Sequence, residues 1–280
     1  MAISINSNTP SIAANQMGKT QKMLENTLSK LASGRKINAA KDNAAGLAIM
    51  TEMDAQMRSF SQAQRNTMDG VSMVQTAEGA MSEMSDAVIR MRELTLQAGN
   101  GALSDDDRAA IDAEISSLMT EVDRIAGTTE FNGQRLLDGS AGEVNFQVGA
   151  NAETENRIAA DLSTPVDSAN LGAGEGAPLN TVSAATAETA LASLNAIDAA
   201  MRDISSRRSD LGTTQNELAT QQRTLAQARV SYAESRSRIA DTDFAETSTQ
   251  LARDQIMMQS SAAVIAQANQ IPAMALSLVG

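Results

Sequence analysis

The sequence contains no cysteine, histidine or tryptophan, and only 1 tyrosine and 4 phenylalanines among its 280 residues. Without histidine and cysteine, the chain lacks the usual general base, the thiol nucleophile and the commonest metal ligands. It also lacks the disulfide pattern from which a redox compartment could be inferred. These absences argue against an enzyme, a metal site and a cofactor. They leave Leu, Ile, Val, Ala and 16 Met to build the core.

Charge is distributed unevenly along the chain. The net charge of −12 argues against a nucleic-acid partner, since phosphate contacts need clustered Lys and Arg. Residues 1–44 hold six basic and two acidic residues, which gives +4, whereas residues 241–280 sum to −3. Opposite charges suit two ends that pair with each other, although solvated helix faces would carry similar charges.

Neither end of the chain has the pattern of a membrane-targeting segment. Residues 1–19 include an Asn- and Pro-containing stretch and lack both a basic n-region and an unbroken apolar h-region, so no cleaved signal peptide is expected. The apolar tail at 256–280 is interrupted by polar residues and by Pro272. We expect this tail to be an amphipathic helix that packs on a partner helix, with no membrane contact.

A seven-residue repeat dominates the last third of the chain. Large apolar or aromatic residues occupy every seventh position, at Ile197, Ile204, Leu211, Leu218, Leu225, Tyr232 and Ile239. This period predicts a long helix packed against other helices, about 65 Å long at ~1.5 Å per residue. The neighbouring row is half polar, which suits a bundle with several partners better than a self-sufficient dimer.

Apolar residues at helical spacing predict three further helices. They cover about 12–31, about 47–98, and a stretch from Ser104 to about Ile125. The second carries a stripe of Met residues, which we interpret as core rather than as a soft-metal surface. The three Asp residues after Ser104 fit a helix cap, because a calcium loop would need a Gly and a distal Glu at set spacings.

The middle of the chain changes to a period of two. Val144, Phe146 and Val148 alternate with polar residues, and Asn132-Gly133 supplies a turn signal. These features predict a small β-hairpin region at about 131–162. The Gly-, Ala- and Ser-rich stretch at 165–185 is expected to be a short connector with little power to form a core. The predicted fold is therefore mainly α, a long coiled-coil or bundle rod with a small β-hairpin region and paired N- and C-terminal arms.

Several long strings closely resemble the two terminal signatures of bacterial flagellins. Near the N-terminus they are LASGRKINAAKDNAAGLAI at 31–49, QRNTMDGVS at 64–72 and QTAEGA at 75–80. Near the C-terminus they are SRSRI at 235–239, AQANQIP at 266–272 and LSL at 276–278. Their number, length and order make the resemblance specific, and it covers all but the connector. Ala32 and Asn43 are examples of modest departures from the residues usual in flagellins, and they affect only details of inner packing.

The resemblance implies a structural subunit of the helical flagellar filament, in a minimal form without outer variable domains. Residues 1–44 and 241–280 would form the inner coiled-coil layer, and residues 45–240 the outer helical shell. The subunit would be secreted without a cleaved signal peptide and would lie in the extracellular filament. Implied partners are other copies of the chain, the flagellar export apparatus, an export chaperone and the filament cap.

The resemblance also implies two sets of site residues. Filament assembly would depend on apolar residues of the inner helices, namely Leu24, Leu28, Leu31, Ile256, Val264, Ile265, Leu276 and Leu278. An animal Toll-like receptor would contact Arg90, Leu94 and Glu114. From the residues alone, Leu94 would be a core residue and both charges would be solvated.

Three other functions remain open at this point. A hook–filament junction protein would share the terminal helices, a coiled-coil adaptor would bind a partner without polymerising, and an enzyme could use only Asp and Glu. Copy number separates the first from a filament subunit, and a fixed small oligomer at any concentration would identify the second. No paired carboxylates in a predicted cleft support the third.

Overall fold

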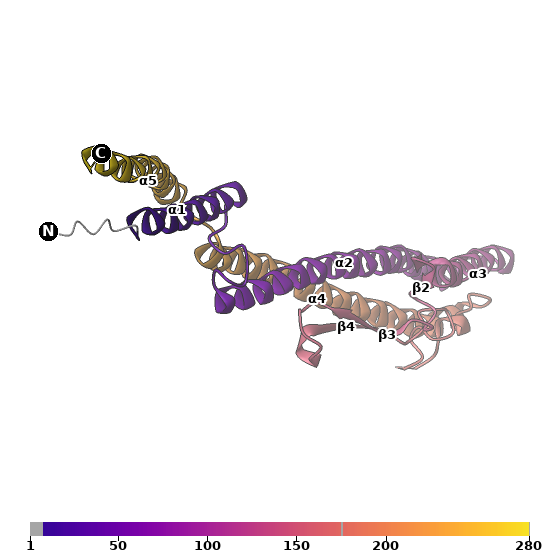
Figure 1. Ribbon diagram of the computed structural model, residues 1–280. Helices are drawn as coiled ribbons and strands as arrows, with labels where there is room; N and C mark the ends of the chain where they lie inside the picture. Colours follow the sequence, from indigo (N-terminus) through magenta and orange to yellow (C-terminus); the bar gives the residue numbers. More distant parts are fainter. Residues whose placement is uncertain (1–7, 175, 280) are drawn as a thin grey trace. The chain divides into compact units, whose positions relative to one another are not determined.

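The computed structural model describes the backbone of residues 8–174 and 176–279, and the side chains of residues 11–174 and 176–270. The protein is mainly helical, with two small two-stranded sheets, as the sequence predicted (Figure 1). It divides into two compact units. Unit 1 comprises Met1–Met57 and Val230–Gly280, and unit 2 comprises Arg58–Arg229.

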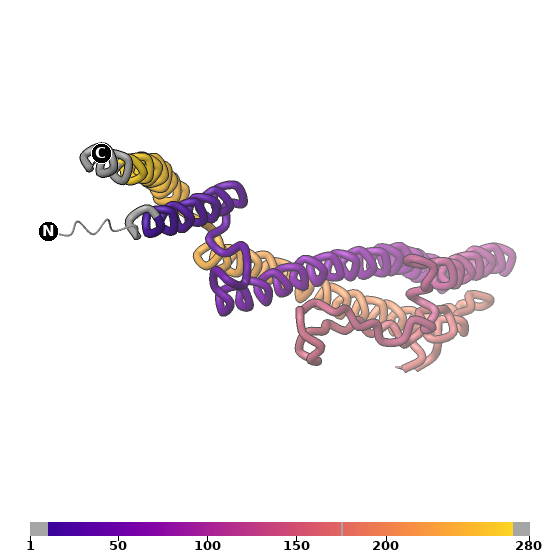
Figure 2. Tube along the Cα trace, in the orientation of Figure 1, coloured from indigo at the N-terminus to yellow at the C-terminus, as the bar shows by residue number. Residues whose placement is uncertain are grey.

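Unit 1 is built on two helices from opposite ends of the sequence. Helices α1 (Asn8–Ser33) and α5 (Phe244–Val279) lie side by side, as Figure 2 also shows. They run antiparallel, because the residues that follow α1 meet those that precede α5. The amide of Lys36 donates to the carbonyl of Ala240 at 2.6 Å, and the backbones of Arg35 and Asp241 form an isolated antiparallel β-bridge. The predicted pairing of the terminal arms is therefore confirmed.

The seam between α1 and α5 follows a heptad pattern on both helices. On α1 the buried and half-buried positions include Ala13, Met17, Thr20, Leu24, Thr27 and Leu31, and on α5 they include Leu251, Asp254, Met258, Ser261, Ile265 and Ala268. Spacings of three and four keep one stripe of each helix against the other. Large apolar positions alternate with small or polar ones, so the two backbones approach closely.

Unit 2 packs most of helices α2 (Ala44–Ala98) and α4 (Ala187–Ala240), together with α3 (Asp105–Thr128), around a core of Leu, Ile, Val, Ala and Met side chains. The predicted Met stripe lies in this core, since Met81, Met84 and Met91 are buried. The heptad row of α4 is buried from Ile197 to Leu225. Within unit 2, α2 and α4 are joined by the ion pairs Arg208–Glu78 at 2.7 Å and Arg92–Asp198 at 2.7 Å. A third pair between the same helices, Arg236–Asp54 at 2.9 Å, lies in unit 1.

The turn between α2 and α3 has the predicted cap. The Ser104 hydroxyl accepts from the amide of Asp107, and the Asp107 carboxylate accepts from the amide of Ser104, which forms a capping box. Arg108 is buried beside it. Its guanidinium donates to the carbonyls of Ala98, Asn100 and Leu103 at 3.0, 2.9 and 2.7 Å, which stabilises the end of α2 and the turn.

The β region contains two separate hairpins. Strands β1 (Glu130–Phe131) and β2 (Gln134–Arg135) are joined by Asn132-Gly133, where both residues have positive φ, as a type I′ turn requires. Strands β3 (Gly142–Gln147) and β4 (Arg157–Leu162) form an antiparallel pair, and a short 3-10 turn, η1 (Thr154–Asn156), precedes β4.

The β3–β4 hairpin is attached to both long helices of unit 2. The side-chain amide of Asn66 on α2 donates to the carbonyl of Gln147, and that of Gln221 on α4 donates to the carbonyl of Val148, both at 3.0 Å. Asn66 and Gln221 therefore lie at the same level of the unit.

The connector at 165–185 does not behave as the sequence suggested. We expected little contribution to a core, but Val166, Leu171, Leu179 and Val182 are all buried in it. The segment includes the 3-10 turn η2 (Leu179–Thr181) and is fixed to α3 by two carboxylates. Asp123 accepts from the Ser168 amide at 2.7 Å, and Asp112 accepts from the Ala184 amide at 2.6 Å. Four spaced aliphatic residues among Gly, Ala and Ser pack the segment on the core, and the two carboxylates of α3 fix its backbone.

The boundaries of the two units lie inside α2 and α4. They differ from 44/45 and 240/241, which divide inner from outer filament layers and stay a prediction about the assembled polymer. No helix in residues 8–174 and 176–279 combines the length and the apolar content that a bilayer crossing requires.

Candidate assembly surface

The apolar residues assigned to assembly separate into two groups in unit 1. Leu24, Leu31 and Ile265 are half-buried at seam positions between α1 and α5. In contrast, Leu28, Ile256 and Val264 are 46%, 65% and 54% exposed. The last two predicted residues, Leu276 and Leu278, have side chains that lie outside the described residues.

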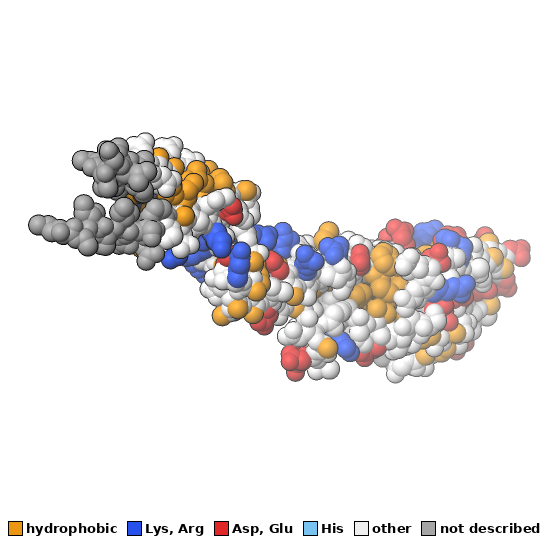
Figure 3. Space-filling view, viewed as in Figure 1, with side chains coloured by type: hydrophobic (Ala, Val, Ile, Leu, Met, Phe, Trp, Pro, Cys, Tyr) orange, Lys and Arg blue, Asp and Glu red, His pale blue; other side chains and the backbone are white. Residues whose placement is uncertain are grey.

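Other exposed apolar side chains extend this surface. Ile12, Met23, Phe244 and Met257 are exposed on the same two helices, and Figure 3 shows apolar side chains gathered over α5. Met257 and Val264 are seven residues apart and share a helix face. Sequence analysis missed these four residues, although the spacing of Met257 and Val264 would have identified a second apolar row on α5. We call the exposed set Ile12, Leu28, Ile256, Met257 and Val264, which comes from more than one solvent-facing side of α1 and α5, the apolar face of unit 1.

Two buried polar residues hold the seam beneath this face. Asp254 is fully buried and accepts hydrogen bonds from the Thr27 hydroxyl at 2.9 Å and from the Gln250 amide at 2.8 Å. A buried carboxylate without donors would be strongly unfavourable, so these bonds favour one alignment of the helices. The heptad pattern of α5 could have placed Asp254 in the seam, but its partner required the structure.

The residues assigned to receptor contact lie together in unit 2, but only two of them are accessible. Arg90 on α2 forms ion pairs with Glu93 and with Glu114 on α3, both at 3.1 Å. The hydrogen bonds that the Arg90 guanidinium donates to Glu93 and Glu114 raise its pKa above the usual value. Leu94 is 2% exposed and belongs to the core, so its side chain is not available to a partner in this conformation.

The described residues offer little for chemistry at either location. Within 8–174 and 176–279, no three Asp or Glu side chains gather in a way that could hold a metal ion. The accessible features are instead an apolar face on paired helices and charged patches on a helical bundle. Such surfaces are suited to association between proteins.

Two family models match the chain, and together they cover most of it. The bacterial flagellin N-terminal helical region matches residues 5–142, and the bacterial flagellin C-terminal helical region matches residues 194–279. The unmatched stretch contains β3–β4 and the connector.

Similar proteins extend over nearly the whole chain. A flagellin of Halalkalibacterium halodurans is 40% identical over 98% of this chain and 99% of its own length. A flagellar filament 30.7 kDa core protein of Treponema maltophilum is 37% identical over 95% of each chain.

A solved structure of a putative flagellar hook-associated protein from Vibrio parahaemolyticus covers 71% of this chain and 100% of its own, with a TM-score of 0.57. At 15% identity this likeness is one of fold alone. The sequence matches, in contrast, extend through both terminal regions at 37–40% identity. The chain therefore belongs to the bacterial flagellins, the non-enzymatic structural subunits that polymerise into the extracellular flagellar filament.

Proposed function

We propose that the apolar face of unit 1 is the surface through which copies of this chain pack together in the inner layer of the filament. The observation that carries this proposal is the separation of the two apolar sets. Leu24, Leu31 and Ile265 are used within the subunit, whereas Leu28, Ile256 and Val264 are left exposed on the same helices. Burying such side chains in neighbouring copies would contribute about 1.5–3 kcal/mol for each fully buried residue.

We also propose the layered arrangement of the filament, which the same surface supports. In this proposal residues 1–44 and 241–280 form the inner layer, and residues 45–240 form the outer shell. The terminal charges of +4 and −3 support pairing of the two segments. Leu276 and Leu278 would extend the inner packing beyond the described side chains.

The assembly proposal is tested with charged substitutions on the exposed side of α5. Ile256→Asp and Val264→Asp place a charge where an apolar neighbour would pack, so they should abolish filaments on sheared seeds in electron micrographs. Gln259→Asp adds the same charge at an exposed polar position of the same helix and should polymerise normally. Circular dichroism of each monomer shows whether the helices persist. Normal filaments from folded Ile256→Asp would contradict the proposal.

The exposure of the apolar face also supports a proposal about partners in export. Before export, an unassembled subunit would expose this face inside the cell. An export chaperone that covers α5 would then prevent early polymerisation. The export apparatus and the filament cap would then handle the chain before and after passage. Pull-down of a chaperone by the full chain, weakened by Ile256→Asp and retained by Gln259→Asp, tests the first of these contacts.

We further propose that Arg90 and Glu114 contact an animal Toll-like receptor when the subunit is free. The exposed Arg90–Glu114 pair bridges α2 and α3 and offers charges of both signs. Leu94 would act indirectly, by packing in the core beneath the pair. In a receptor reporter assay Arg90→Asp should reduce signalling, whereas Arg124→Asp, which reverses an exposed charge elsewhere on α3, should not. An unchanged response to Arg90→Asp would remove the idea.

A further inference from the structure

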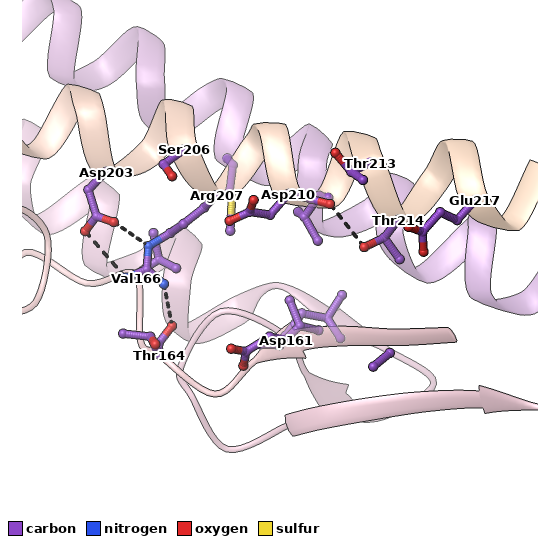
Figure 4. A pocket seen from close by; sticks show the side chains of 15 residues that line it. Asp161, Thr164, Val166, Asp203, Ser206, Arg207, Asp210, Thr213, Thr214 and Glu217 are labelled. Atoms are coloured by element: carbon purple, nitrogen blue, oxygen red, sulfur yellow. Dashed lines mark hydrogen bonds and ion pairs between the residues drawn. The ribbon is translucent and has the colours of Figure 1, made fainter. Parts of the chain in front are cut away.

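Unit 2 contains a groove lined by carboxylates that have no assigned role. The groove has a volume of about 530 Å³ and lies between α4 and the segment that includes β4 (Figure 4). Asp203, Asp210 and Glu217 project into it from α4 at intervals of seven residues, and Asp161 faces them from β4. We call this the acidic groove.

Some carboxylates of the acidic groove form no ion pair with a described residue. At one end Arg207 pairs with Asp203 at 2.8 Å and donates to the carbonyl of Thr164, which neutralises that end. Among the described residues, the carboxylates of Asp210 and Glu217 have no ion-pair partner. Because the hydroxyl groups of Ser206, Thr213 and Thr214 also line the groove, it suits cationic groups that donate hydrogen bonds.

A complementary set of charges lies at one end of the same unit. Arg58 and Arg65 on α2 are seven residues apart and exposed, and Arg223 and Arg229 on α4 are also exposed. Since Asn66 and Gln221 meet adjacent residues of the hairpin, Arg65 and Arg223 lie at about the same level. We call these four residues the basic band.

The arginines of the basic band have no carboxylate partner among the described residues. Arg65 donates to Gln62 and Arg223 donates to Thr220, both of which are uncharged. Within one subunit, the basic band lies too far from the middle of the acidic groove to pair with it. Asp210 and Arg223 are 13 positions apart on one helix, which is about 20 Å and exceeds the screening length of about 8–10 Å at moderate salt. Glu217 is nearer, at six positions or about 9 Å along the helix, but Arg223 donates to Thr220 instead of pairing with it.

We propose that the acidic groove receives the basic band of a second copy of this chain. The proposal rests on the proposed filament function and identifies one lateral contact of its outer shell. The two patches are different surfaces of one molecule, so the contact is heterologous. Repetition of such a contact produces an open helical polymer when its rotation does not close into a ring, which is the arrangement a filament requires. The seven-residue spacing of Arg58 and Arg65 matches that of Asp210 and Glu217, so two charges align in one register.

Reciprocal charge reversal tests the contact between copies. The groove variant carries Asp210→Lys and Glu217→Lys, and the band variant carries Arg58→Glu and Arg65→Glu. Each variant alone presents like charges at the contact and should raise the critical concentration for growth on seeds by about tenfold or more. An equal mixture should grow near the wild-type critical concentration, because each groove then meets a band of opposite charge.

Matched controls separate this contact from general effects of charge and folding. Glu83→Lys and Asp86→Lys reverse two exposed charges on α2 outside the groove and should leave growth unchanged. The neutral pair Asp210→Asn and Glu217→Gln should raise the critical concentration less than the reversal, and it replaces the groove variant if circular dichroism shows that variant to be unfolded.

The possible outcomes decide the proposal independently of the apolar face. Normal growth of either reversed variant overturns the contact, and so does a mixture that grows no better than its components. Ile256→Asp, which acts on the apolar face, reports separately on assembly through unit 1. If Ile256→Asp polymerises normally while the reversed pairs rescue each other, the proposed function fails and the groove contact stands.

Discussion

Thr27 and Asp254, which are separated by most of the sequence, form a buried hydrogen bond of 2.9 Å between α1 and α5. Thr27→Val keeps the shape of the side chain but removes the donor, which leaves a buried carboxylate oxygen without this partner. The expected loss is about 1–3 kcal/mol in the free energy of unfolding of unit 1. Urea unfolding, followed by hydrogen exchange of the α1 amides, measures it.

Two further variants decide whether the loss belongs to this bond. Thr27→Ser retains the hydroxyl and should be close to wild type. Combining Thr27→Val with Asp254→Leu should recover much of the lost stability, because an apolar pair leaves no buried polar group. Additive effects in the double variant would mean that the two residues act independently.

A second prediction concerns the buried guanidinium of Arg108. Arg108→Met keeps the aliphatic bulk but leaves the carbonyls of Ala98, Asn100 and Leu103 without their donor. Because hydrogen bonds that involve a charged group are each worth about 1.5–3 kcal/mol, we expect a loss of about 3 kcal/mol or more in the free energy of unfolding. Urea denaturation of the full chain measures it. Arg124→Met, at an exposed position on the same helix, should change little, and equal losses in both variants would contradict the capping role.

The Met stripe of α2 supplies a third prediction with an internal control. Met84 is buried in the core of unit 2, whereas Met68 on the same helix is 52% exposed. Met84→Ala should lower the free energy of unfolding by about 2–5 kcal/mol through lost burial and the remaining cavity. Met68→Ala should change it by less than about 0.5 kcal/mol. Thermal unfolding of both variants makes the comparison, and similar midpoints would argue against a Met-built core.

The helical part of the fold could be predicted from the sequence because local patterns, the heptad period and the helix cap, determine it. The heptad from Ile197 to Leu225 is buried as predicted, and the Ser104 cap is formed with Asp107. Each of these signals is local, since the period of a helix and the chemistry of its first turn depend on neighbouring residues.

The errors arose where distant contacts decide the structure. The connector was expected to lie outside the core, yet Leu171 and Leu179 are fully buried because Asp112 and Asp123 on α3 hold the segment in place. Similarly, no local pattern shows that Thr27 meets Asp254. The burial of Leu94, in contrast, was indicated by the helical spacing of its apolar neighbours, and it was the resemblance that pointed to an accessible side chain. The composition of a segment indicates how that segment would fold alone. It does not show which hydrogen-bond partners or apolar contacts a distant helix supplies.

The final prediction concerns the pH dependence of the α3 cap. Hydrogen bonds from the hydroxyl and amide of Ser104 lower the pKa of the Asp107 carboxyl below its usual value. A lowered folded-state pKa means that the ionised carboxylate stabilises the fold above the unfolded pKa of about 3.9, and that this contribution is lost as the pH falls through the folded pKa. Asp107→Asn should therefore differ from wild type at neutral pH and converge with it below about pH 4.

Amide hydrogen exchange at Ser104 and in the first turn of α3 measures this convergence, because local opening there depends on the cap. Asp106→Asn is the matched control, since Asp106 is an exposed neighbour outside the capping box. It removes the same charge from the helix N-terminus and so accounts for the interaction of a carboxylate with the helix dipole. If both variants show the same dependence on pH, the effect belongs to the dipole, and the reciprocal bonds between Ser104 and Asp107 add nothing measurable to it.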